Sequence, residues 1–175
     1  MLSQAAAREL ALRAKDTPPT LEIDDSRARE LRTGWFFPYR STVGSSVLGT
    51  RGLVVNKGTG SIFYLGSAFP VERDLALYDK GYQFAVYDLV ITMIADVERT
   101  LDTLEKLELS IVEPKYEYGV VWRIPRLLRR DELRARLKSL PHVFGAVHLY
   151  FRADVLEEAR GGSAFRFELR GLHNT

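Results

Sequence analysis

The sequence predicts an α+β fold, with a mixed or mostly antiparallel sheet and helices packed largely on one face. Short runs of aromatic and β-branched residues alternate with amphipathic segments of helical period. Clusters of Pro and Gly separate these segments, as turns between elements would. The hydrophobic content of 46% in 175 residues is ordinary for a globular chain that buries a core.

The N-terminal part is expected to hold a helix, a short strand and a turn. Ser3 can cap a helix that continues to about Lys15. The Pro-Pro pair in 17–19 ends this helix, because proline cannot continue it. A short strand is expected over 21–23, and the charged segment 24–32 is expected to form a turn.

An aromatic strand and a hairpin follow. Trp35–Tyr39 is dense in aromatic residues and predicts a strand, in which Pro38 indicates an edge position or the strand's end. Trp35 is expected to be a core residue. The segments 53–55 and 61–65 are expected to pair around a glycine-containing turn, since glycine tolerates the positive φ that such turns need.

The second half begins with a long apolar run. Phe84–Ile94 predicts a central strand, and Asp96 is expected to cap the helix that follows. The apolar stripe expected on this helix is Val97, Leu101, Leu104 and Leu107 or Glu108. Residues 116–124 alternate and predict one strand. Its aromatic residues share one face, which favours a place in the core: Tyr116, Tyr118 and Trp122.

Helices and strands continue to alternate to the C-terminus. A helix is expected over 128–140, ended by Pro141, with Leu133, Leu137 and Leu140 facing inward. The remaining elements are a strand over 146–152, a helix over 154–160 and a strand over 165–169. This β-α-β-α-β order makes a ferredoxin-like arrangement one option for the second half. We therefore expect two units, 1–82 and 83–175, with a sheet continuous between them as an open alternative.

Residues suited to metal binding or thiol chemistry are sparse. The chain has no cysteine, which excludes disulfides and cysteine metal sites and fits a reducing cytoplasm. The histidines are expected in a turn, a strand and the tail, and not in a metal site: His142, His148 and His173. We expect no metal and no cofactor.

Nucleophile and nucleotide motifs are incomplete. Ser45, Ser46 and Ser61 lie in turn-like segments and not in the strand-to-helix elbow of a catalytic serine. Gly44–Thr50 has the glycine spacing of a phosphate loop but lacks the lysine that reaches the phosphates. The sequence therefore predicts that the protein is not an enzyme.

One segment concentrates positive charge, although the net charge is only +2. Its basic residues flank and decorate the helix expected over 128–140: Arg123, Arg126, Arg129, Arg130, Arg134, Arg136 and Lys138. We interpret them first as a solvated face of an amphipathic helix, partly neutralised by Asp131 and Glu132. The alternative is an electropositive surface that meets an acidic protein or, less in keeping with the charge balance, RNA.

The first half resembles a known family through three motifs. These are Gly34-Trp35 followed by aromatic residues, the hairpin turn Asn56–Gly60, and the Leu65-Gly66 turn before a helix near Pro70. That helix would carry Leu75, Leu77 and Tyr78. Over residues 3–82 the chain resembles the immunity protein 35 (YrhB-like) family of bacterial polymorphic-toxin immunity proteins.

The resemblance implies a function in interbacterial competition. Members of this family bind a cognate toxin, so the expected activity is neutralisation of a toxin domain in the cytoplasm by occluding its active site or its access to substrate. Exposed aromatic and arginine side chains are the expected contacts: Tyr39, Arg40, Arg51, Arg126, Arg130 and Arg134. The alternative is an RNA-binding or small-ligand-binding ferredoxin-like domain, or an uncharacterised enzyme. No apolar run is long enough to span a membrane, nucleic acid is not an expected partner, and the sequence leaves the oligomeric state open.

Overall fold

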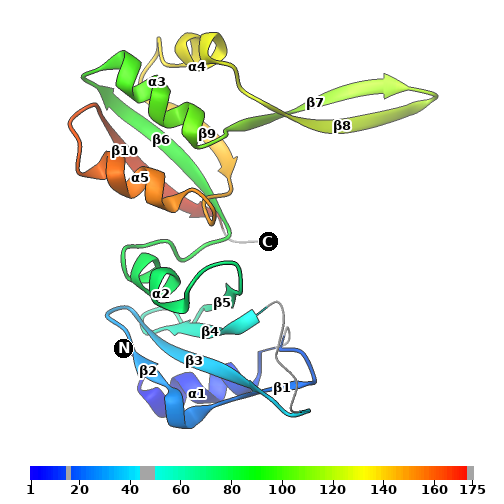
Figure 1. The fold of residues 1–175 in the computed structure, drawn as a ribbon, viewed down its shortest axis with the longest axis vertical. Coiled ribbons are helices and arrows are strands. Elements are labelled where there is room, and N and C mark those ends of the chain that lie inside the picture. Colours follow the sequence, from blue (N-terminus) through cyan, green and yellow to red (C-terminus); the bar gives the residue numbers. More distant parts are fainter. Residues whose placement is uncertain (15–16, 44–49, 173–175) are drawn as a thin grey trace. The chain divides into compact units, whose positions relative to one another are not determined.

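The computed structural model describes residues 1–14, 17–43 and 50–172. It confirms the α+β class, with antiparallel strand pairs throughout the described residues. The chain divides into two compact units, Met1–Gln83 and Phe84–Thr175 (Figure 1). Each unit is described below by itself.

The first unit is a small sheet with two helices. Its elements in chain order are α1 (Gln4–Leu12), β1 (Leu21–Ile23), a 3-10 turn (Asp25–Arg27), β2 (Arg29–Glu30), β3 (Gly34–Ser41), β4 (Thr50–Asn56), β5 (Ile62–Gly66) and α2 (Val71–Asp79). The strand order is β1-β3-β4-β5, and β2 also pairs with β3. The Ser3 cap is confirmed, because its hydroxyl accepts a hydrogen bond from the Ala6 amide.

The edge position expected for the aromatic strand is wrong. Strand β3 lies inside the sheet, with β1 and β2 on one side and β4 on the other. Pro38 instead marks the end of a ladder, because the pairing with β4 runs from Gly34↔Asn56 to Pro38↔Gly52. A proline, which donates no hydrogen bond, fits at this position.

The two helices of the first unit cover opposite faces of the sheet. Neighbouring residues on a strand point to opposite sides, so Phe37 packs with α1 while Phe36 packs with α2. Trp35 is only half-buried against the α1 side, where its Nε1 donates to the Leu2 carbonyl at 3.1 Å. The core role expected for Trp35 is therefore confirmed only in part.

The β4–β5 hairpin and the helix after it are confirmed. Asn56 Oδ1 accepts the amides of Gly58 and Thr59 at 2.9 and 3.1 Å, which holds the turn, and Gly60 has φ of 73°. Helix α2 starts after Pro70 and buries the three residues expected inward: Leu75, Leu77 and Tyr78.

The second unit contains eight elements and two separate sheets. They are β6 (Val86–Ile94), α3 (Val97–Lys106), β7 (Ser110–Glu117), β8 (Val120–Leu127), α4 (Arg130–Arg136), β9 (His142–Val147), α5 (Ala153–Arg160) and β10 (Phe165–Leu172). Strand β6 is central in the order β10-β6-β9, as its apolar sequence predicted. Helices α3 and α5 lie on one face of this sheet (Figure 1).

The strand order of this sheet is that of an incomplete ferredoxin-like fold. Strands β9 and β10 both run antiparallel to β6, and α5 connects them. A ferredoxin-like sheet places a fourth strand beside the strand that β9 represents. The segment between α3 and α4, which would supply it, forms the two-stranded sheet β7–β8 instead (Figure 1).

Several expected bounds and burials are corrected. Residues 116–124 are not one strand, because a turn at Tyr118–Gly119 divides them. Strand β9 is His142–Val147 and not 146–152. It contains a bulge before its last residue, where Ala146 has φ of 55° and its amide donates to Asp88, and Val147 still pairs with Tyr87 beyond the bulge.

The helix corrections have local causes. Helix α4 ends at Arg136, four residues before the expected end, and Leu140 is exposed. On α3, Val97 is exposed, whereas Thr100 is buried. The Thr100 hydroxyl donates to the Asp96 carbonyl at 2.6 Å, which lets a polar residue take an inward position. The Asp96 cap itself is confirmed by its hydrogen bond from the Arg99 amide.

Gly34→Ala should destabilise the first unit by about 1–3 kcal/mol, because a Cβ atom there would lie 2.5 Å from Val54 Cγ1 and 3.1 Å from the Val55 carbonyl oxygen. Chemical denaturation measures this loss. Gly58→Ala is the matched control, since its Cβ would approach no described atom closer than 3.4 Å. Equal stability of the two variants would contradict the prediction.

Candidate functional site

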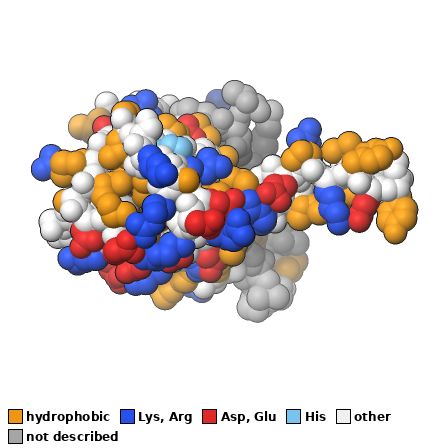
Figure 2. Space-filling model, turned by 90° about the horizontal axis from the view of Figure 1, so that it is seen from above, with side chains coloured by type: hydrophobic (Ala, Val, Ile, Leu, Met, Phe, Trp, Pro, Cys, Tyr) orange, Lys and Arg blue, Asp and Glu red, His pale blue; other side chains and the backbone are white. Residues whose placement is uncertain are grey.

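The most exposed feature of the second unit is the ribbon formed by β7 and β8. We call Ser110–Leu127 the β-arm. Its strands pair from Ser110↔Leu127 at the root to Glu117↔Val120 at the tip. The β-arm projects away from the sheet and helices of its own unit (Figure 1), and apolar side chains follow it outward with charged ones between them (Figure 2). A two-stranded ribbon by itself is marginally stable in water, so its exposure calls for an explanation.

Large apolar side chains cover the β-arm and lack core contacts. The exposed ones are Val112, Tyr116, Tyr118, Val120, Val121, Trp122, Ile124 and Leu127. Tyr118 is 98% exposed, Tyr116 73% and Trp122 53%. The expectation that these three aromatic residues lie in the core is therefore wrong. Contiguous apolar surface of this kind marks interaction sites in soluble proteins.

The tip of the β-arm is a strained two-residue turn. Tyr118 has φ of 51° and Gly119 has φ of 77°. Positive φ at both central residues is the signature of a type I′ turn, whose twist matches that of the flanking strands. Asn or Gly normally occupies the first position, because a larger side chain is disfavoured there. A fully exposed tyrosine at this position is consistent with a role in recognition.

The two faces of the β-arm differ in chemistry. Residues paired across the strands share a face, so Tyr116 and Val121 lie on one side and Lys115 and Trp122 on the other. The first face is apolar except for Arg123 and, at the root, Ser110. Toward the tip, the second combines apolar residues of β8 with charged residues of β7, where Lys115 and Glu117 form an ion pair of 3.0 Å.

Each outer edge of the β-arm carries a proline. In a hairpin closed by a two-residue turn, the pair beside the turn is hydrogen-bonded and the pairs then alternate. Pro114 and Pro125 fall in non-hydrogen-bonded pairs, so their nitrogen atoms face outward. A proline there removes a donor from the free edge and limits pairing with another strand. The outer edge of β7 is thus interrupted in its middle, and that of β8 only near its root.

Arg126 fixes the root of the β-arm. Its guanidinium binds both carboxylate oxygens of Glu132, at 2.7 and 2.8 Å, and Glu113 at 2.8 Å. The hydrogen bonds from Arg126, followed by that from the Arg129 amide, lower the pKa of Glu132 to about 2. The Leu128 amide closes the root on the Leu109 carbonyl at 2.8 Å, and both of these leucines are buried.

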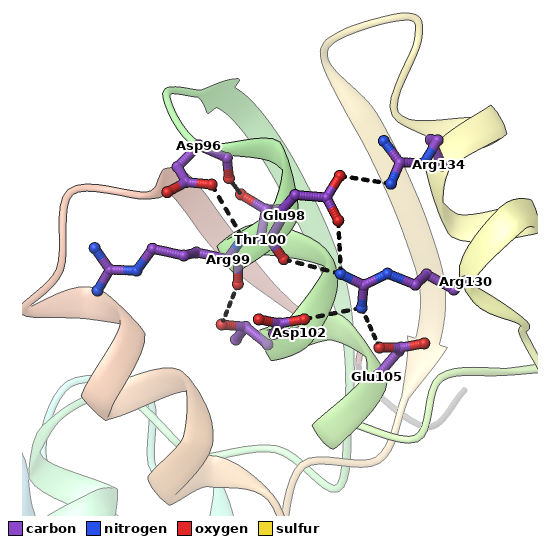
Figure 3. A network of polar contacts seen from close by, with 9 residues as sticks. Asp96, Glu98, Arg99, Thr100, Asp102, Glu105, Arg130 and Arg134 are labelled. Carbon is purple, nitrogen blue, oxygen red and sulfur yellow. Dashed lines mark hydrogen bonds and ion pairs between the residues drawn. The ribbon is translucent and has the colours of Figure 1, made fainter.

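Two arginines of α4, Arg130 and Arg134, pair with an acidic row on α3 (Figure 3). Arg130 binds Glu98 at 2.8 Å, Asp102 at 2.9 Å and also Glu105. Arg134 binds Glu98 at 2.6 Å. Hydrogen bonds from Arg130 and then from Arg134 lower the pKa of Glu98. The expectation that Arg130 faces solvent is therefore corrected, since it is half-buried and joins two helices.

The contact residues expected in the first unit lie on two neighbouring strands. Tyr39 and Arg40 follow each other on β3. The Tyr39 hydroxyl shares a 2.9 Å hydrogen bond with that of Thr17, and Arg40 pairs with Glu22 at 2.7 Å. Arg51, at the start of β4, is exposed. The segment with the glycine spacing of a phosphate loop, which holds Ser45 and Ser46, lies outside the described residues apart from Thr50.

The histidine placements need correction. His142 lies in β9 and not in a turn, and His148 follows that strand. His142 Nε2 is buried without a hydrogen-bond partner, and its ring meets that of Phe144 edge-on at 4.7 Å. Burial, followed by the charge of Arg136, lowers the pKa of His142. His173 lies outside the described part of the chain, within which no three His, Asp or Glu side chains gather as metal ligands would.

Comparison with known protein families, with curated proteins and with solved structures found no match to this chain. Among the described residues, no helix has the length and apolar character needed to cross a membrane.

Tyr118→Asn should stabilise the β-arm, because asparagine tolerates positive φ better than tyrosine does. Amide hydrogen exchange within the β-arm should slow by roughly threefold, while exchange in β6 should not change. Tyr116→Asn, at a position of ordinary strand geometry, is the control and should not slow exchange. Unchanged or faster exchange in Tyr118→Asn would argue against strain at the tip.

Glu132→Gln should reveal the clamp at the root through its pH dependence. The folded-state pKa of Glu132 is about 2, against 4.5 for an ordinary Glu, so its stabilising effect is present above pH 4.5 and is lost as the pH falls toward 2. The melting temperature of Glu132→Gln should therefore lie below that of the parent at neutral pH and converge with it in acid. Glu168→Gln on β10 controls for removal of an exposed charge. A gap that stays constant with pH would contradict the assignment.

Proposed function

We propose that this protein is a binding protein that neutralises a bacterial toxin domain by occluding its active site or its access to substrate. The observation that carries the binding function is the β-arm, which presents exposed aromatic residues on a ribbon outside the core. The toxin as partner rests on the resemblance of residues 3–82 to the immunity protein 35 family. The two parts of the proposal therefore rest on different halves of the chain.

The chemistry of the β-arm suits insertion into a cleft of a protein partner. Tyr and Trp side chains dominate the binding energy of many interfaces, since they bury a large area with few rotatable bonds. Tyr118 at the tip and Trp122 behind it are such residues. A narrow ribbon with aromatic side chains can enter a concave active site that a flat surface would only cover.

The charges of the second unit favour contact through the β-arm over contact through α4. Arg130 and Arg134 are already paired with α3, so they offer little free charge to steer a partner. Arg123 makes no ion pair within the described residues and lies on the apolar face of the β-arm. Contacts by Tyr39, Arg40 and Arg51 remain a proposal for the first unit.

RNA binding is the second candidate, and a specific observation favours it. Proteins stack single-stranded bases on exposed aromatic residues beside basic side chains. The β-arm offers Tyr116 with Arg123 on one face and Trp122 with Lys115 on the other. The pairing of Arg130 and Arg134 with α3 and the net charge of +2 weigh against it, because phosphate contacts supply most of such affinity.

Trp122→Ala should weaken binding to the cognate toxin domain by about tenfold to a hundredfold, without lowering the melting temperature. The side chain is half exposed and supports no core, so only binding should suffer. Co-purification, calorimetric titration and growth of toxin-expressing cells measure the effect. Val97→Ala, which truncates an exposed apolar residue on α3, is the matched control.

Two results would count against the proposal. Wild-type affinity in both Trp122→Ala and Tyr118→Ala would remove the β-arm from the interface. Tight binding of a single-stranded RNA oligomer at physiological salt, lost in Trp122→Ala, would favour the RNA-binding candidate.

A further inference from the structure

The sheet of the second unit has a vacant strand position beside β9. Within residues 84–172, β9 pairs only with β6, and its other edge has no neighbouring strand. A cleft of about 160 Å³ lies along that edge, lined on one side by Val143 and Phe144 and on the other by Leu109, Ile111 and Leu128. Val143 is half exposed there. The cleft occupies the place of the fourth strand of a ferredoxin-like sheet.

The segment that would fill this position is the β-arm itself. It follows α3 in the chain, as the fourth strand of a ferredoxin-like sheet does. From Ser110 onward, however, its two strands pair with each other and not with β9. Each chain thus has an unfilled strand position beside β9. Its β8, which belongs to the segment that would fill this position, has an outer edge without a neighbouring strand among the described residues. A second copy of the chain can supply the missing strand, as in homodimers that exchange an identical element between protomers.

We propose that two copies of this chain exchange β-arms, the tip half of β8 in each copy adding to β9 of the other as a fourth strand. The β-arm extends for eight paired positions, roughly 27 Å at the rise of an antiparallel strand. A two-fold axis at the middle of two antiparallel arms places each tip at the other copy's root. The contact is closed and self-complementary, so assembly stops at the dimer.

The prolines select the strand that adds. On β7, Pro114 interrupts the outward edge in the middle of the strand. On β8, the outward edge is free of proline from Val120 to Ile124 and is interrupted only by Pro125. The regular part of β9 is also short, because its bulge lies at Gly145 and Ala146. The available lengths of the two edges therefore match.

The surroundings of the cleft complement the tip. Arg136 lines the cleft and makes no ion pair within the described residues, and Glu117 at the tip could exchange its exposed ion pair with Lys115 for one with Arg136. The apolar residues Ile111 and Val143, which line the cleft and are partly exposed, would receive side chains of β8. Exchange would thereby cover part of the apolar surface that the isolated chain leaves in water.

The exchange does not depend on the identity of a toxin partner. It uses the same β-arm, however, so dimer formation and insertion of the β-arm into a partner exclude each other. Self-association would then compete with partner binding. The two ideas can be tested separately, because the dimer forms from the protein alone.

The first test uses the backbone of β8. Arg123→Pro removes an outward-facing amide donor while leaving the hydrogen-bonded pairs of the hairpin, and Arg123→Thr removes the same side chain but keeps the donor. Analytical ultracentrifugation of the untagged full chain should show a dimer for the parent and for Arg123→Thr, and for Arg123→Pro a monomer that circular dichroism shows to be folded. A monomeric parent at all accessible concentrations, or a dimer that survives in Arg123→Pro, would overturn the proposal.

The second test exploits the absence of cysteine. Tyr118→Cys combined with Val143→Cys should form disulfide-linked dimers under mild oxidation, because the tip of one copy meets β9 of the other. Tyr118→Cys combined with Glu168→Cys, on the opposite edge strand β10, is the matched control and should remain uncrosslinked. Equal crosslinking in both variants, or crosslinking through Tyr118→Cys alone, would contradict the proposed geometry.

Discussion

The two-residue turn at Tyr118–Gly119 sets the register on which the properties of the β-arm depend. With only two residues in the loop, Glu117 must face Val120, and every later pair follows from that one. The register decides that Tyr116 and Trp122 lie on opposite faces and that both prolines point outward. A turn longer by one residue would move the apolar side chains of β8 to the other face and place Pro125 in a hydrogen-bonded position.

Local signals in the sequence predicted the structure correctly where a single side chain determines the local backbone conformation. Ser3 and Asp96 cap their helices as expected, since each side chain satisfies an otherwise free amide. The turn at 56–60 was predictable from its glycines, whereas the buried side of α2 was expected from the family resemblance. The miss at residues 116–124 has a physical cause. A hairpin with a two-residue turn keeps an alternating pattern in both strands, so alternation alone does not reveal the turn. Gly119 within the run was the available signal.

The exposure of the β-arm could not be inferred from its composition. Alternation of large apolar residues normally reports a sheet packed on a core, and here the same pattern lies in water. The pairing of the α4 arginines, in contrast, was readable from the sequence. Glu98, Asp102 and Glu105 are spaced four and three apart and form one row along α3, while Arg130 and Arg134 form a row of their own on α4. The interpretation of the arginines in 123–136 as one positive patch did not take the acidic row on α3 into account.

The separation of the β-arm from the core has an evolutionary consequence. Most substitutions in a folded protein are removed by selection because they disturb packing, but the exposed side chains of the β-arm have no core neighbours to disturb. Residues from Val120 to Ile124 are therefore free to vary while the sheet and helices stay the same. A lineage carrying this architecture can track a changing partner by altering one hairpin, at little risk of losing the folded state.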